Sequence, residues 1–186
     1  MSNSKLTNER DAHLQSEAAG LSLRAATSDD TVLIASMHAQ SWARAYRGIL
    51  PDDWLDRDLQ AERAAHWQTR MQEIVAGASC LLIAEHAGEP VGFVCFDQPD
   101  ASGSVYIDNL HALPMGRGLG AGTAMLAEAA RWARSRGAHQ LHLLVLEQNT
   151  AAIGFYESRG WKREARLAEQ MAGIDVFSLR YVLPLE

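Results

Sequence analysis

The stretch that decides the fold spans residues 113–126 and reads Leu113-Pro114-Met115-Gly116-Arg117-Gly118-Leu119-Gly120-Ala121-Gly122-Thr123-Ala124-Met125-Leu126. An apolar, strand-like run at 104–112 leads into it, and an alanine-rich, helix-like run at 123–136 leads out of it. Glycines at alternate positions let the backbone pass close to a ligand and turn successive N–H groups toward it. A glycine loop that opens a helix adds the positive end of the helix dipole, so we predict a phosphate site here.

Three phosphate-binding patterns compete for this loop. A P-loop requires Gly-Lys-Ser/Thr, and this pattern is excluded because the stretch contains no lysine. The run Gly116-x-Gly118-x-x-Ala121 matches the dinucleotide fingerprint, but an NAD site also needs an acidic residue about 20 positions later. Residues 140–142 are Gln140, Leu141 and His142 instead. The third pattern, Arg-x-x-Gly-x-Gly, is therefore favoured over a glycine-rich turn that binds nothing.

This third pattern runs from Arg117 to Gly122, and a second motif follows it. Residues 149–161 read Asn149-Thr150-Ala151-Ala152-Ile153-Gly154-Phe155-Tyr156-Glu157-Ser158-Arg159-Gly160-Trp161. The two motifs resemble, in order and separation, those of the GNAT superfamily of acyl-CoA N-acyltransferases. The resemblance extends from about Leu21 to Leu183.

The resemblance implies an α/β (α+β) protein with the GNAT fold: a mixed, mainly antiparallel central sheet of about six to seven strands, flanked by helices on both faces and splayed where two central strands part. We expect a polar N-terminal tail at 1–20, with an optional short helix at 9–18, and a single domain at 21–186. Hydrophobic periodicity predicts strands at 21–24, 79–86, 90–97, 104–112, 139–146, from 161, and at 175–183. It predicts helices ending near 46, and at 54–59, 61–75, 123–136 and 149–160.

The bulk composition narrows the function classes. The 186 residues carry a net charge of −6, which argues against a nucleic-acid partner. No apolar run reaches membrane-spanning length, and residues 1–20 lack the apolar core of a secretory signal. We interpret Cys80 and Cys95 as reduced, buried thiols. We predict no metal site, because His139 and His142 are expected on opposite faces of one strand. These features favour a cytoplasmic protein.

The resemblance implies acetyl-CoA as co-substrate and identifies the residues that bind it. Backbone amides around the loop suit the pyrophosphate: Arg117, Gly118, Leu119, Gly120, Ala121, Gly122 and Thr123. The pantetheine arm is expected to pair with the strand at Leu110 and Ala112, where an N–H near Ala112 polarises the thioester carbonyl. Asn149 either bonds the pantetheine or caps the following helix.

Acyl transfer to an amine also needs proton donors and acceptors. Tyr156 matches the family position that often donates to the leaving sulfur; its alternative is a packing role. Relatives often carry a glutamate base where this chain has Tyr106. Asp108, two residues on and on the same strand face, is our first candidate base. His111, which alternation places on the other face, is the second, and proton loss to solvent with positioning alone is the third.

The acceptor pocket is expected from the first helices, by resemblance. Trp42, Tyr46 and Asp53 are predicted to form an aromatic and acidic site for a cationic amine, with core packing as the alternative. The predicted function is direct ternary-complex transfer of acetyl to a primary amine of a small molecule or peptide. A non-catalytic acyl-CoA-binding module is the alternative, because Tyr106 stands at the usual base position. Acetylation of aminoacyl-tRNA is disfavoured by the acidic charge, and a homodimer is suggested by analogy alone.

Overall fold

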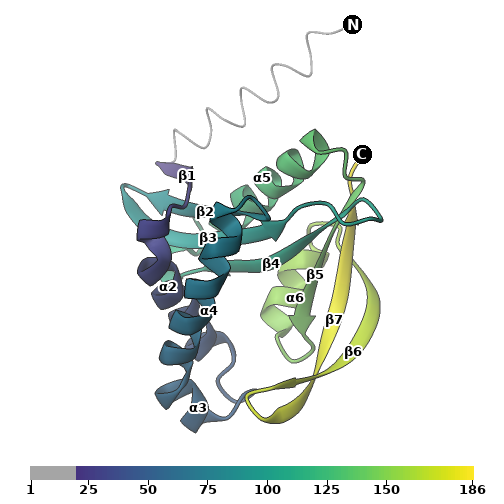
Figure 1. The fold of residues 1–186 in the computed structure, drawn as a ribbon. Coiled ribbons are helices and arrows are strands. Elements are labelled where there is room, and N and C mark those ends of the chain that lie inside the picture. The colour runs from purple at the N-terminus through teal and green to yellow at the C-terminus, as the bar shows by residue number, and fades with distance from the viewer. Residues whose placement is uncertain (1–19) are drawn as a thin grey trace, which may run out of the picture.

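A seven-stranded sheet forms the centre of the computed structural model, which describes residues 20–186 (Figure 1). Its strands, in the order β1-β2-β3-β4-β5-β7-β6, pair antiparallel except for the parallel pair β4–β5. The strands are β1 (Leu21–Ala25), β2 (Ser79–His86), β3 (Glu89–Asp97), β4 (Ser104–Ala112), β5 (Gln140–Leu146), β6 (Lys162–Met171) and β7 (Ile174–Pro184). The predicted mixed, mainly antiparallel sheet is confirmed. The optional helix at 9–18 lies outside the described residues.

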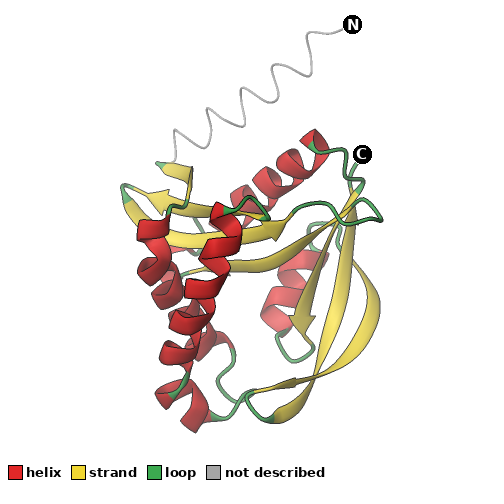
Figure 2. Ribbon diagram, in the orientation of Figure 1, coloured by secondary structure: helices red, strands yellow, loops and turns green. Residues whose placement is uncertain are grey.

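Helices cover both faces of this sheet (Figure 2). On one face lie α2 (Thr31–Ala45) and α4 (Leu59–Val75), joined through the short α3 (Asp52–Arg57). On the other lie α5 (Ala121–Ser135) and α6 (Thr150–Glu157). Short 3-10 turns occupy Ser28–Asp30 and Pro114–Gly116. None of the helices described in residues 20–186 is both long and apolar enough to cross a bilayer.

Alternation along β3 shows how the sequence divides the core between these faces. Phe93 and Cys95 pack under α2 and α4, whereas Val94 and Phe96 pack under α5. All four are fully buried, as expected for a strand covered on both sides. The alanine-rich face of α5 permits close approach to the sheet.

The parallel pair at the centre of the sheet is short. It runs from Ser104 opposite Gln140 to Ile107 opposite Leu143, four residue pairs in all. Beyond Ile107, β4 continues to Ala112 beside β3, while β5 continues to Leu146 beside β7. The two strands therefore part toward their carboxyl ends, which is where ligands of such sheets bind.

Candidate active site

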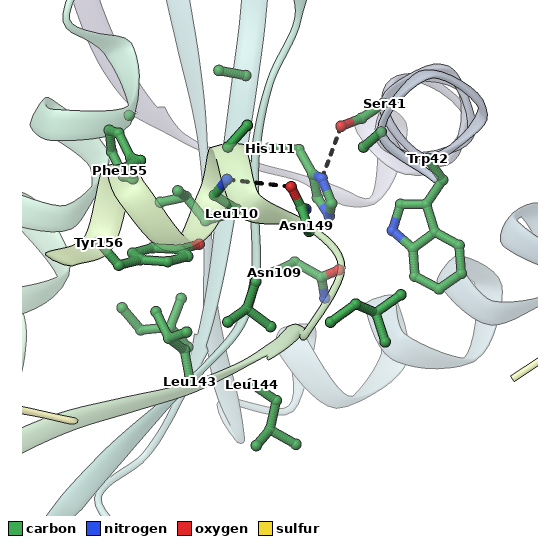
Figure 3. A pocket seen from close by; sticks show the side chains of 18 of the residues that line it. Ser41, Trp42, Asn109, Leu110, His111, Leu143, Leu144, Asn149, Phe155 and Tyr156 are labelled. Carbon is green, nitrogen blue, oxygen red and sulfur yellow. Dashed lines mark hydrogen bonds between the residues drawn. The ribbon is translucent and has the colours of Figure 1, made fainter. Parts of the chain in front are cut away.

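A cavity of about 850 Å³ opens where β4 and β5 part. Its lining comes from α2, α4, β4, the glycine loop, β5, α6 and the β6–β7 hairpin. Figure 3 shows α6 with Phe155 and Tyr156 on one side, α2 with Ser41 and Trp42 on the other, and β4 residues between them. The sequence motifs thus meet at one site.

The four glycines of the loop are explained in two ways, two by their backbone conformation and two by the space around them. Gly118 and Gly120 have φ of +78° and +77°, a left-handed conformation that favours glycine. Gly116 and Gly122 are instead limited by space: a Cβ would lie 2.7 Å from the Val91 carbonyl oxygen at Gly116 and 2.9 Å from the Phe155 ring at Gly122. Only the first pair serves the turn itself.

The loop amides also divide into two groups. Those of Arg117 and Leu119 donate to the carbonyls of Pro114 and Gly116, at 3.2 and 3.4 Å, and are engaged within the turn. In the described part of the chain, the remaining loop amides have no backbone or side-chain acceptor: Gly118, Gly120, Ala121, Gly122 and Thr123. Because α5 begins at Ala121, two residues earlier than predicted, three of these five are the unsatisfied donors of its first turn. Amides gathered at a helix start form an anion site.

Arg159 adds a positive side chain to this anion site, and it was not singled out from the sequence. Its guanidinium donates to Thr123 Oγ1 at 2.9 and 3.1 Å and lies 3.8 Å from the Phe155 ring centroid. Its place three residues after Tyr156 in the second motif is the signal that could have revealed it, since residues three apart share a helix face.

Tyr156 lies on α6 with its ring packed 5.7 Å from that of Trp161. The hydroxyl points toward the side of the cavity where Leu110 and Asn149 lie (Figure 3). Burial, and then the neighbouring Tyr46, raise the pKa of the Tyr156 phenol above its usual value. The group is therefore protonated at neutral pH and suited to donate a proton.

Asn149 is the N-cap of α6, because its Oδ1 accepts the Ala152 amide at 3.2 Å. Its side chain also lines the cavity and lowers the pKa of the nearby Tyr46 phenol, against the larger rise caused by burial. The structure therefore shows the helix-capping role, one of the two roles expected for Asn149 from the sequence.

A β-bulge sets the direction of the candidate bases on β4. Opposite Cys95 and Phe96 of β3 stand Asn109 and Ile107, so Asp108 is an extra residue without a partner. Asp108 then lies 3.4 Å from Arg70 on α4, and His111 Nδ1 lies 2.9 Å from Ser41 Oγ on α2. The expectation that His111 faces away from Asp108 is wrong, because the bulge resets the alternation and turns both toward α2 and α4.

The electrostatic surroundings of the two bases differ. Burial raises the pKa of Asp108, and Arg70 opposes that rise. Burial lowers the pKa of His111 to about 3, and Arg63 adds to the fall, so this imidazole is neutral near pH 7. Asp108 also accepts a hydrogen bond from the Asn109 side chain at 2.8 Å. Asp108 can gain and lose a proton nearer neutral pH than His111 can.

Comparison with known proteins decides the family. The model described as "Acetyltransferase (GNAT) family" matches residues 39–161, more than half of the chain. The chain belongs to the GNAT acetyltransferase family. Among its relatives, the uncharacterized N-acetyltransferase YuaI of Bacillus subtilis (strain 168) is 28% identical over 159 residues, which are 83% of this chain and 87% of YuaI.

Two solved GNAT structures share the fold. The PaiA N-acetyltransferase of Thermoplasma acidophilum, in complex with coenzyme A, superposes with a TM-score of 0.70 at 19% identity, covering 86% of this chain and 97% of that one. The spermidine N-acetyltransferase of Vibrio cholerae, in complex with CoA and spermine, gives 0.67 at 20% identity, covering 90% and 96%. The predicted superfamily is confirmed.

One wall of the GNAT cavity is aromatic and basic. Trp42 and Tyr46 pack edge to face with ring centroids 5.0 Å apart, and the Arg63 guanidinium lies 4.5 Å from the Trp42 ring centroid. His66 of α4 also lines the cavity, and its buried Nε2 has no hydrogen-bond partner among residues 20–186. Arg63 and His66 were not predicted, because only packing brings α4 against α2.

Asp53 does not join Trp42 and Tyr46 at this wall. Its side chain is 86% exposed and lies 3.7 Å from Arg57, the next turn of α3. The buried face of α3 carries Leu55, and residues two apart on a helix point to nearly opposite sides. The predicted contact of Asp53 with the acceptor is not supported by this geometry.

No metal site accompanies the cavity in the part of the chain that is described. Within residues 20–186, no three His, Cys, Asp or Glu side chains are grouped so as to hold a metal ion.

Proposed function

We propose that this GNAT protein is an acetyl-CoA-dependent N-acetyltransferase that transfers acetyl directly to a primary amine of a small molecule or peptide in a ternary complex. The observation that carries the proposal is the set of unpaired amides at Gly118 and Gly120–Thr123, which lies beside the parting of β4 and β5. A diphosphate fits such donors, because amides at a helix start offer directed hydrogen bonds and a favourable dipole.

The chain also offers a place for the rest of coenzyme A. After Ile107, β4 is no longer paired with β5, and Leu110 and Ala112 on this part of β4 line the cavity. An extended arm laid there would gain main-chain hydrogen bonds, as an added strand does. Bound acetyl-CoA supplies an acetyl group activated as a thioester, and the N–H near Ala112 would stabilise the negative charge that develops on its carbonyl oxygen.

The proton steps are then assigned to groups on the two sides of the gap. Asp108 accepts the proton of the attacking amine, directly or through water, and Tyr156 donates a proton to the departing sulfur. His111 is the second candidate base, and its lowered pKa makes it the weaker one. The Vibrio cholerae neighbour is a spermidine N-acetyltransferase in complex with CoA and spermine, which supports a small amine as the acceptor of this chain.

Thioester consumption, followed by release of free thiol over a panel of amines, tests the proposal. Turnover that needs both acetyl-CoA and an amine, with no acetyl-enzyme formed in the absence of the amine, is expected. Tight coenzyme A binding without turnover would favour the acyl-CoA-binding module, which Tyr106 at the usual base position supports. Cytoplasmic location and a homodimer stay predictions.

A further inference from the structure

Glu169 of β6 lies on the cavity wall opposite α2 and α4, beside Met171 and Ser178. Its carboxylate accepts a hydrogen bond from Ser178 Oγ at 2.8 Å, and Ser178 is itself buried. β6 is exposed along most of its length, yet Glu169 is half-buried. The residue therefore faces inward from a strand that mostly faces solvent.

This carboxylate has no counter-charge among residues 20–186, since no basic side chain there lies within 4.0 Å of it. Three other carboxylates do have cationic partners: Glu164 with Arg180, Glu147 with Arg166, and Asp108 with Arg70. Arg63, a basic residue of the opposite cavity wall, is already paired with Glu62 and stacked on Trp42. A cationic group of a ligand in the cavity would supply the counter-charge that this carboxylate lacks.

Glu169 and the proposed base, Asp108, line the same cavity. Tyr106 is close enough to feel both acids: after burial, the charges of Asp108 and then Glu169 raise the pKa of its phenol. Apolar side chains, Leu144 and Met171, line the same cavity. An acceptor with one amine at Asp108 would thus run along an apolar surface and end near Glu169.

We infer that Glu169 is a specificity residue that binds a second cationic group of the acceptor, so that the preferred substrates are aliphatic diamines rather than monoamines. The inference rests on the proposed function, because it takes Asp108 as the place of the reacting amine. Ser178 positions the carboxylate through its hydrogen bond.

The test compares putrescine, butylamine and γ-aminobutyrate, which share a four-carbon chain and end in a cation, a methyl group and an anion. The wild-type kcat/KM is expected to be at least about tenfold higher for putrescine than for butylamine, equivalent to ~1.4 kcal/mol, and lowest for γ-aminobutyrate. Glu169→Gln keeps the shape and can still accept from Ser178. It should remove the preference for putrescine over butylamine, mainly by raising the KM for putrescine.

Glu164→Gln is the matched control, since it removes a carboxylate from the same strand outside the cavity. It should leave all three acceptors unaffected, and the thermal midpoints of both variants should show that they fold. Equal use of putrescine and butylamine by the wild type, or an unchanged preference in Glu169→Gln, overturns the inference and leaves the proposed function standing. Glu169-dependent putrescine binding by calorimetry in the presence of coenzyme A, with no amine acetylated, overturns the proposed function and, with it, the substrate preference, and supports only the binding of a cation by Glu169.

Discussion

The Tyr156 hydroxyl has no hydrogen-bond partner among the described residues, although its ring is packed against Trp161. Tyr156→Phe should therefore fold normally and lose the proposed proton donor. We expect kcat to fall about 10²-fold, the lower end of general acid effects, with the KM for acetyl-CoA nearly unchanged. Steady-state kinetics with thiol detection measure both constants.

Tyr181→Phe is the control, because Tyr181 donates its hydroxyl to Glu157 away from the cavity. That variant should lose stability, by about 1 kcal/mol for a typical hydrogen bond, and keep its turnover. Unchanged kcat in Tyr156→Phe would leave Tyr156 with a packing role only.

If Asp108 is the general base, its ionisation determines how kcat/KM changes at low pH. A base must be ionised, so kcat/KM falls as pH drops through the pKa of the free enzyme. Since burial raises the pKa of Asp108, this acid limb should lie above the pH at which an ordinary aspartate titrates. In Asp108→Asn the limb should vanish and the plateau should fall about 10²-fold.

The same profile separates the two candidate bases. A limb carried by His111 would lie near pH 3, where its lowered pKa falls. An acid limb that persists unshifted in Asp108→Asn would therefore remove Asp108 from the mechanism.

At the scale of elements, the contact between α5 and α6 depends on Gly122. Its φ is not positive, so only space forbids a side chain there, and the obstacle is the Phe155 ring at 2.9 Å. Gly122→Ala should cost about 1–3 kcal/mol of unfolding free energy, as overpacking does. It should also weaken coenzyme A binding, because Phe155 carries the Arg159 guanidinium.

Gly154→Ala is the matched control for this variant. Gly154 lies in α6, and a Cβ there would meet nothing within 4 Å. It should be neutral or stabilising by up to about 1 kcal/mol through helix propensity. Denaturant unfolding measures both variants, and the double variant Gly122→Ala/Phe155→Leu should recover stability. Equal stability of Gly122→Ala and wild type would show that the ring moves away freely.

Most elements could be predicted because each carries a local signal. Hydrophobic periodicity predicted bounds within about two residues of the structure for most elements. The glycine loop and Tyr156 could be placed together because both lie in motifs at the carboxyl side of neighbouring strands.

Features that depend on distant parts of the chain could not be predicted in this way. The bulge at Asp108 exists only relative to the register of β3, so simple alternation misplaced His111. Gly122 is explained by Phe155, and Arg63 by Trp42, contacts that join separate helices. The exposure of Asp53 could not be predicted, because the face of α3 that packs is not evident in six residues.

At the scale of the whole molecule, the pairing between the two parts of the sheet is weakest along the proposed cofactor site; we call this short β4–β5 pairing the weak line. β4 and β5 share four residue pairs, whereas β5 and β7 share seven. At the far end, Leu146 and Val176 pack with Leu50 and Leu55 from the segment around α3. A ligand laid along the parting strands would therefore contact both sides of this line.

We expect acetyl-CoA to stabilise the folded protein by bridging that line. At a concentration about 100-fold above its Kd, a ligand that binds only the native state adds about 2.7 kcal/mol. For a chain of this size, that corresponds to a rise in Tm of about 5–10 °C. Pantetheine at the same concentration lacks the diphosphate and should give a much smaller shift, because the amides of Gly118 and of residues 120–123 would stay unpaired. Hydrogen exchange with acetyl-CoA should slow at these amides and along residues 108–112; equal shifts from the two ligands, or unaltered exchange at the loop, would place the cofactor elsewhere.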